Sequence, residues 1–75
     1  ASTGASAVGW ALQNAANLQS RLGDHVSARA TWQEVENAWK TTMPVDAPVW
    51  TPYRISRAAT ELALGDAASA AQLLR

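Results

Sequence analysis

His25 is the only histidine of the chain and stands beside a carboxylate, Asp24, so this pair is the first place to look for chemistry. A zinc site would need further histidine or cysteine ligands, and the sequence has no cysteine and no second histidine. A general base needs a group whose proton it can take, and Asp24 is better explained as a helix cap. We therefore expect His25 to be an ordinary surface residue of a first helical turn, and we predict no metal site.

The other polar side chains form no catalytic pattern. Glu34 and Glu36 are two residues apart, so on a helix they do not face each other. No serine lies in the sharp turn of a nucleophile elbow, and the four glycines are scattered and form no phosphate-binding loop. We predict no catalytic residue and no cofactor, and we expect that the chain is not an enzyme.

A short segment that occurs twice indicates how the chain folds. Leu-Gly-Asp stands at residues 22–24 and 64–66; each time an alanine follows four residues after the aspartate and a large apolar residue four further on. Glycine adopts the left-handed conformation that ends many helices, and aspartate caps the start of the next helix. Each copy therefore predicts a tight turn between two antiparallel helices.

Apolar residues at steps of three and four on both sides of these turns predict four amphipathic helices. We place them at residues 7–22, 24–41, 52–64 and 66–75, with Ser6 and Thr51 as N-caps. Arg57 and Glu61, four apart, are expected to pair. The residues expected to face inward are Val8, Ala11, Ala15, Leu18 and Leu22, then Ala28, Trp32, Val35 and Trp39, then Ile55, Ala58, Ala59 and Leu62, and finally Ala70, Leu73 and Leu74, with Leu12 and Ala16 widening the first stripe.

The predicted fold is a single all-α domain over residues 1–75, made of two hairpins. The first hairpin covers about 6–41 and the second about 52–75. Residues 41–51 form the connector, since Pro44 and Pro48 block a helix there. Its apolar content suggests that it packs on the helices.

The spacing resembles that of the tetratricopeptide repeat family, in which a similar turn is followed by a small residue and then a large one. Gly23 and Gly65 match the turn glycine of that family. The copies here lie 42 residues apart, whereas the family repeats every ~34 residues. The resemblance implies four antiparallel helices in a right-handed array. The other positions that match are Ala16, Ala28 and Trp32 in the first copy and Ala58, Ala70 and Leu74 in the second.

In that family the first helix of each hairpin lines a concave groove that holds a peptide. Here the resemblance assigns to this groove Trp10, Gln13, Asn14, Asn17 and Arg21 from the first helix and Ile55, Ala59 and the nearby Arg54 from the third. The alternative is a plain polar surface on the first helix.

The four tryptophans divide into two pairs. We expect Trp32 and Trp39 in the core. Trp10 and Trp50 are each either a hydrophobic staple or an exposed anchor for a partner, because tryptophan is enriched at binding hot spots. We therefore include both among the partner-binding residues.

Composition limits the classes of partner. Six basic and six acidic residues balance, which argues against binding of nucleic acid or an anionic membrane by this segment and makes association of copies plausible. No run of residues has the length of a membrane span, and no basic and apolar leader is evident, so we expect a cytoplasmic protein. The first residue is not methionine, which suggests the inside of a longer chain or a processed end.

We therefore predict a non-catalytic module that binds a protein or peptide, or a second copy of itself. The alanine-rich, lysine-poor composition resembles the helical repeats that follow helix-turn-helix domains in actinobacterial transcriptional regulators. This resemblance favours the dimerisation or signal-receiving region of a larger bacterial regulator. The alternatives are a stand-alone peptide-binding adaptor and a structural helical segment of an enzyme or secretion assembly.

Overall fold

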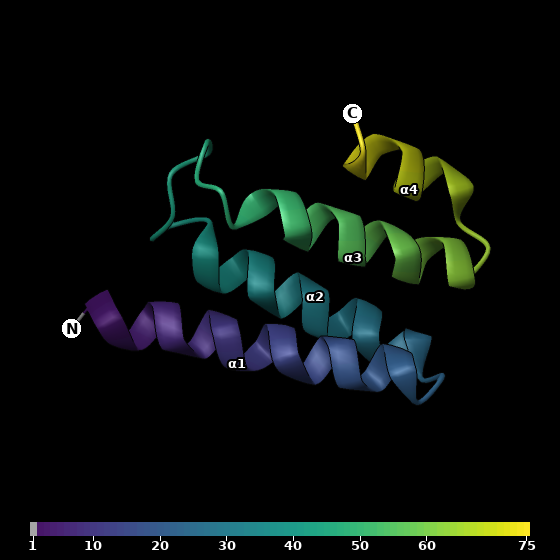
Figure 1. The fold of residues 1–75 in the computed structure, drawn as a ribbon, viewed down its shortest axis with the longest axis horizontal. Coiled ribbons are helices and arrows are strands. Elements are labelled where there is room, and N and C mark those ends of the chain that lie inside the picture. Colours follow the sequence, from purple (N-terminus) through teal and green to yellow (C-terminus); the bar gives the residue numbers. More distant parts are fainter. Residues whose placement is uncertain (1) are drawn as a thin grey trace.

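The computed structural model describes residues 2–75, with side chains from Ala7 onward. Over these residues the chain is all-helical, as predicted. The helices lie one above another in chain order, so α1 and α4 are at opposite ends of the stack (Figure 1). Their bounds are Ser2–Arg21 for α1, His25–Trp39 for α2, Trp50–Ala63 for α3 and Ala67–Leu73 for α4.

The four helices form the two predicted antiparallel hairpins. α1 packs along α2, and α3 packs along α4. The hairpins meet where α3 lies against α2 and, to a smaller extent, against α1 (Figure 1). Among the helices of residues 2–75, α4 packs only against α3.

Both Leu-Gly-Asp turns have the predicted geometry. Gly23 and Gly65 have φ angles of 83° and 82°, in the region that only glycine enters without a steric cost. The N–H of Asp24 donates to the Gln19 carbonyl over 2.9 Å, and the N–H of Asp66 donates to the Glu61 carbonyl over 2.8 Å. These bonds satisfy carbonyls that a helix end leaves free.

The two aspartates then cap the next helices, as predicted. The Asp24 carboxylate accepts from the Ser27 N–H at 3.2 Å, and the Asp66 carboxylate accepts from the Ser69 N–H at 3.1 Å. Hydrogen bonds from the serines lower the pKa of both carboxyl groups.

The core is built on α2, where all four predicted inward residues are fully buried. They are Ala28, Trp32, Val35 and Trp39. Ala16 from α1 and Tyr53 from α3 complete the buried cluster. The wide rings of the two tryptophans fill the space on both sides of α2, which explains how so short a chain encloses a core.

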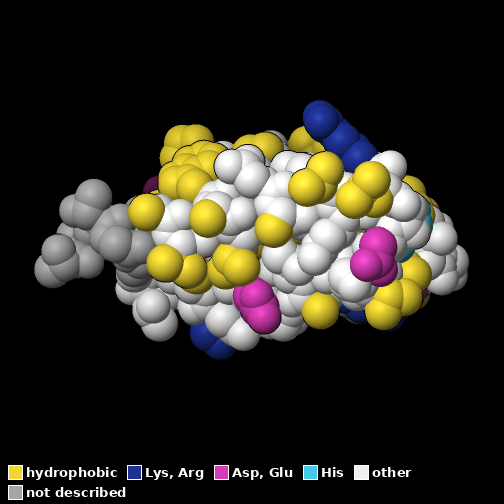
Figure 2. All heavy atoms as spheres, turned by 90° about the horizontal axis from the view of Figure 1, so that it is seen from below, with side chains coloured by type: hydrophobic (Ala, Val, Ile, Leu, Met, Phe, Trp, Pro, Cys, Tyr) yellow, Lys and Arg dark blue, Asp and Glu magenta, His cyan; other side chains and the backbone are white. Residues whose placement is uncertain are grey.

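The predicted inward stripe of α1 is confirmed only in part: Ala16 is fully buried and Leu12 packs against the core, but other expected positions face outward. Val8, Leu18 and Leu22 are more than half exposed, at 53%, 56% and 76%, and Figure 2 shows hydrophobic side chains spread over the side of the molecule that α1 forms. Between residues 7 and 21 of α1, the buried positions are Gly9 and Ala16. A Cβ atom at Gly9 would overlap the Trp39 indole, so the two helices touch closely there. The missing side chain of Gly9 is what allows this face of α1 to approach Trp39.

The second hairpin also departs from the predicted pattern. Ala58 and Ala70 are buried and Leu73 is half-buried, as expected. Other residues expected to face inward are exposed, because no helix of the described chain covers that side of α3 and α4. They are Ile55, Ala59, Leu62 and Leu74.

Neither predicted serine or threonine cap begins a helix. α1 already includes Ser6, whose side chain lies outside the described residues. α3 begins at Trp50, ahead of Thr51, with Val49 as a cap that makes no side-chain hydrogen bond. Pro52 is tolerated in the first turn, because the N–H groups there have no partner within the helix.

Candidate functional site

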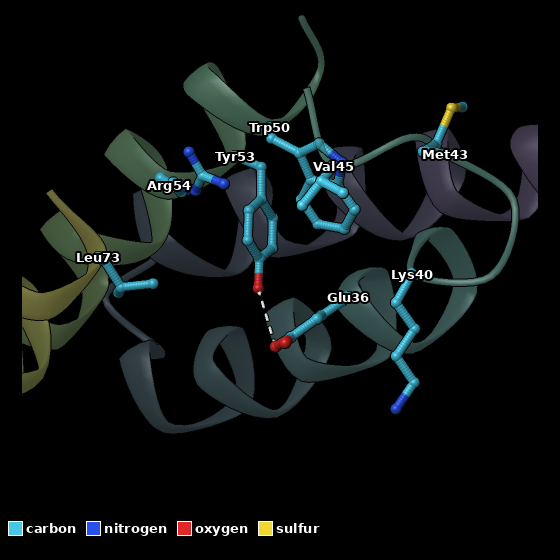
Figure 3. A pocket seen from close by; sticks show the side chains of 8 residues that line it. All are labelled: Glu36, Lys40, Met43, Val45, Trp50, Tyr53, Arg54 and Leu73. Atoms are coloured by element: carbon cyan, nitrogen blue, oxygen red, sulfur yellow. Dashed lines mark hydrogen bonds between the residues drawn. The ribbon is translucent and has the colours of Figure 1, made fainter. Parts of the chain in front are cut away.

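A pocket of about 300 Å³ opens beside the connector (Figure 3). It lies between the second half of α2, the connector and the start of α3, and the end of α4 closes one side. Its apolar lining comes from Met43, Val45, Trp50, Tyr53 and Leu73.

Trp50 is held rigidly in this lining. Its indole N–H donates to the Pro44 carbonyl over 2.7 Å, which ties the connector to α3. The ring packs edge-on against Tyr53 at 5.3 Å and against Trp39 at 6.0 Å between centroids. Such edge-to-face pairs favour one orientation of each ring, so the aromatic wall is preorganised.

Three charged side chains surround the apolar lining, and only one of them is already paired. The Glu36 carboxylate accepts from Arg57 at 2.9 Å and from the Tyr53 hydroxyl at 3.3 Å. Burial raises the pKa of Tyr53, so its hydroxyl remains a donor. Lys40 and Arg54 form no ion pair with any described residue. The pocket therefore offers an apolar surface next to two free positive charges.

No family model matches the sequence, and comparison with curated proteins and with solved structures gave no match. The pocket and the surfaces around it must therefore be interpreted from their own chemistry.

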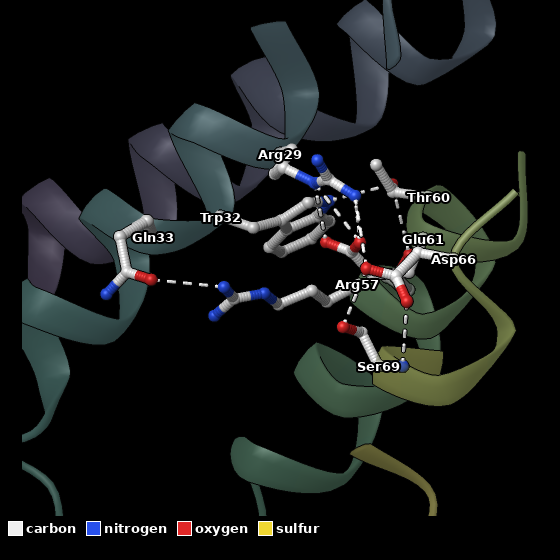
Figure 4. Close-up of polar contacts among 9 residues, drawn as sticks. Arg29, Trp32, Gln33, Arg57, Thr60, Glu61, Asp66 and Ser69 are labelled. Atoms are coloured by element: carbon white, nitrogen blue, oxygen red, sulfur yellow. Dashed lines mark hydrogen bonds and ion pairs between the residues drawn. The ribbon is translucent and has the colours of Figure 1, made fainter. Parts of the chain in front are cut away.

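A polar layer beside the pocket joins the two hairpins (Figure 4). Arg29 of α2 binds the Glu61 carboxylate through two nitrogens, at 3.0 and 2.5 Å. The Glu61 side chain is only 5% exposed, and its hydrogen bond raises the pKa of Arg29. The predicted Arg57–Glu61 pair is wrong, because each residue finds its partner on α2 instead.

Thr60 extends this layer into the core. Its hydroxyl lies 3.1 Å from the Ser20 hydroxyl of α1 and accepts from the Trp32 indole N–H of α2 at 3.2 Å. One buried hydroxyl therefore joins three helices. Buried polar groups with partners of this kind favour one packing arrangement, because any shift would leave a donor or acceptor unsatisfied.

The structure separates the predicted partner-binding residues into two groups. Trp50 and Arg54 line the pocket. The predicted residues of α1 do not line it: Asn14 and Arg21 are exposed and Asn17 is half-buried.

Of the two remaining predicted residues of α1, only Trp10 makes a contact that supports the fold. Trp10 is 46% exposed and packs its ring against Trp39 at 5.3 Å, so it both supports the core and presents a surface. Gln13 is half-buried, and its side-chain oxygen has no hydrogen-bond partner among the described atoms.

The sequence did not identify the other pocket residues, which are Glu36, Lys40, Met43, Val45, Tyr53 and Leu73. The apolar connector was expected to pack on the helices. Met43, Val49 and Trp50 do pack against the core, whereas the expectation is wrong for Val45, which is 87% exposed. Nothing in the spacing indicated that Leu73, near the end of the chain, approaches the connector. That proximity exists only because the turn at Gly65 reverses the chain and leads α4 back along α3.

The structure shows neither a metal cluster nor a membrane helix in the part of the chain that it describes. No three histidine, cysteine or acidic side chains of residues 2–75 gather closely enough to hold a metal ion. None of the described helices combines the length and hydropathy that crossing a membrane requires.

Proposed function

We propose that this chain is a non-catalytic protein-interaction module that binds a peptide segment in the pocket beside the connector. The segment places an apolar side chain against Trp50 and Tyr53 and a neighbouring carboxylate near Lys40 and Arg54. The observation that carries this proposal is the pairing of a preorganised aromatic wall with two unpaired cationic side chains.

The chemistry of the pocket favours an acidic and apolar peptide. The charge of Glu36 is engaged by Arg57, so the available charge at the rim is positive. Aromatic side chains that are already ordered lose little freedom on binding, and tryptophan, tyrosine and arginine dominate binding hot spots. A pocket of this size suits one or two side chains and not a whole helix.

The state of the carboxylates supports a non-catalytic role. Four of the six carboxylates are engaged: Asp24 and Asp66 cap helices, while Glu36 and Glu61 pair with arginines. The other two, Glu34 and Asp46, are exposed and do not line the pocket. A general acid or base needs a carboxylate that is free to exchange a proton with a substrate. The hypothesis that this module belongs to a larger bacterial regulator rests on the resemblance of its composition to the helical repeats of such regulators.

Selection from a displayed library of random peptides tests the proposal. We expect selected peptides to contain an aromatic or aliphatic residue next to aspartate or glutamate. Titration of such a peptide should shift the indole N–H resonance of Trp50 more than that of Trp32, which is buried outside the pocket.

Two matched variants locate the binding surface. Arg54→Glu reverses an exposed charge at the pocket, and we expect at least ~10-fold weaker binding of the selected peptide. Asn14→Ala removes an exposed side chain of the alternative surface on α1 and should leave binding unchanged. The reverse result, with loss for Asn14→Ala only, would reject the pocket and favour the groove that the family resemblance implies.

A further inference from the structure

Two exposed apolar surfaces lie at opposite ends of the helix stack, and no helix of the described residues covers them. The first, which we name the α1 face, includes Val8, Leu18 and Leu22. It belongs to the side of the molecule on which Figure 2 shows scattered hydrophobic side chains. The second, which we name the end face, consists of Ile55, Leu62 and Leu74, at 56%, 56% and 58% exposure. A hollow of about 280 Å³ between α3 and α4 includes Ile55 and Leu74 in its lining.

The internal repeat shows what the α1 face is built to meet. A shift of 42 residues, the spacing of the two Leu-Gly-Asp turns, relates residues 8–21 of α1 to residues 50–63 of α3. The α3 residues related to this face contact the first hairpin: Trp50 packs on Trp39, and Thr60 bonds to Trp32 and Ser20. In order along the helix, Val8, Ala11, Ala15, Leu18 and Leu22 correspond to Trp50, Tyr53, Arg57, Thr60 and Leu64.

The same shift shows what the end face is built to meet. Leu62 and Leu74 correspond to Ser20 and Trp32, the two residues through which the first hairpin holds Thr60. Within the chain, α3 packs on a surface of the first hairpin, and the end face occupies the equivalent positions of the second hairpin. In the same way, the α1 face occupies the positions equivalent to those through which α3 makes that contact.

We propose that copies of this chain associate head to tail, with the α1 face of one copy packed on the end face of the next. The contact continues the interface that already joins the two hairpins within one chain. It uses surfaces outside the peptide pocket and does not rest on the proposed function.

The residues that differ between the contact within the chain and the equivalent outer faces suit such an association. Within the chain, Ser20, Trp32 and Thr60 meet through hydrogen bonds. At the corresponding places between copies, Leu62 and Leu74 would meet Leu18. These three side chains carry no polar group, so their burial leaves no donor or acceptor unsatisfied.

The formal charge of zero leaves no net repulsion between copies. Because the two contacting faces differ, the association is heterologous, and each added copy presents a free face for another.

Two variants test the pairing of the faces. Leu18→Glu should disable only the α1 face and Leu62→Glu only the end face, and both positions are exposed in a single copy, so the fold should be retained. We expect the parent chain to show a mass in sedimentation equilibrium that rises with concentration above the 7.9 kDa of one copy. Each variant alone should associate at least ~10-fold more weakly, because an unpaired carboxylate would be buried.

An equimolar mixture of the two variants is the decisive sample. Leu62→Glu retains an intact α1 face and Leu18→Glu an intact end face, so the mixture should form a dimer and no larger species. Val45→Glu, at an exposed site of the connector, serves as the matched control and should associate like the parent. Circular dichroism confirms that each variant is folded.

Several results would overturn the proposal. One is a parent chain that stays a monomer at every concentration. Another is a single variant that still dimerises by itself, since that would show a contact between two identical faces. A mixture that remains monomeric would reject the pairing of these two faces, and loss of association in Val45→Glu would move the contact to the pocket.

Discussion

The two hairpins share the same turn but not the same packing. Gly23 and Gly65 have nearly equal φ angles, and both following aspartates cap through a serine three residues on. Beyond the turn, Trp32 is fully buried, whereas Leu74 at the equivalent position is 58% exposed. The local chemistry of a hairpin is therefore independent of how much core it encloses.

The difference arises from the neighbours of each hairpin. The first hairpin is covered by α3, which supplies Tyr53 and Thr60 to the ring of Trp32. The second hairpin has no helix on the corresponding side among the described residues. Burial at a repeated position thus depends on whether another layer follows it.

We expect the largest difference in the free energy of unfolding between variants of Trp32 and Leu74, which occupy equivalent positions in the two hairpins. Trp32→Ala should lower the free energy of unfolding by ~3–5 kcal/mol, because it leaves a large cavity and removes a donor to Thr60. Leu74→Ala should change it by less than about 0.5 kcal/mol, as is usual for exposed sites. Urea unfolding at low protein concentration measures both, and equal losses would show that the end face is buried in the monomer.

Enlarging the buried alanines tests the close packing in each hairpin. Ala28→Leu and Ala70→Leu should each cost about 1–3 kcal/mol, since both sites are buried and surrounded. We expect the cost at Ala28 to be the larger, because Ala28 belongs to the main core cluster and Ala70 packs at the outer helix. Thermal unfolding followed by circular dichroism measures this; variants that melt like the parent would disprove close approach of the helices.

Gly9→Ala should destabilise the first hairpin, although alanine is the better helix former by ~1 kcal/mol. The added methyl group would overlap the Trp39 indole, and overpacking costs roughly 1–3 kcal/mol. Thr51→Ala, at the equivalent exposed site of α3, is the matched control and should be nearly neutral. A more stable Gly9→Ala variant would mean that Trp39 can move away from α1 without a cost.

We expect the smallest effect on stability from changes at the two aspartate caps, which are alike in the two hairpins. Their aspartate pKa values lie below the ordinary 3.8 in the folded state. The stabilisation is therefore complete above pH 3.8 and is lost as the pH falls through the lower folded pKa. Asparagine caps equally well but does not titrate, so Asp24→Asn and Asp66→Asn should each flatten the acid part of a stability–pH curve.

The comparison of these two variants sharpens the result. Asp66 also lies 3.7 Å from Arg29, whose charge helps to lower its pKa. The charge of His25 lowers the pKa of Asp24 in the same way, so Asp66→Asn and Asp24→Asn should flatten the curve to a similar extent. An unchanged curve in both variants would show that the carboxylates contribute no differential proton binding.

The pattern of residues predicted α2 correctly because its apolar side chains are large and its stripe is unambiguous. The same reasoning centred the inward stripe of α1 too far towards Val8, Leu18 and Leu22, whereas Gly9, Leu12 and Ala16 form the contact surface. Small residues give little hydrophobic signal, yet Gly9 and Ala16 permit the approach that Trp39 requires. Of the residues that line the pocket, Trp50 and Arg54 were predicted to bind a partner. Leu73 was not, because only the folding of α4 back along α3 brings it to the pocket.

The sequence by itself determined the four helices, the two turns and their caps, because hydrogen bonds and backbone preferences act over a few residues. Only the tertiary structure decided that Arg57 pairs with Glu36 and Arg29 with Glu61, and that the connector, α2, α3 and α4 enclose one pocket. Those outcomes depend on which surfaces lie side by side after the chain has reversed three times. Ion pairing and burial are properties of that proximity, and no local rule specifies it.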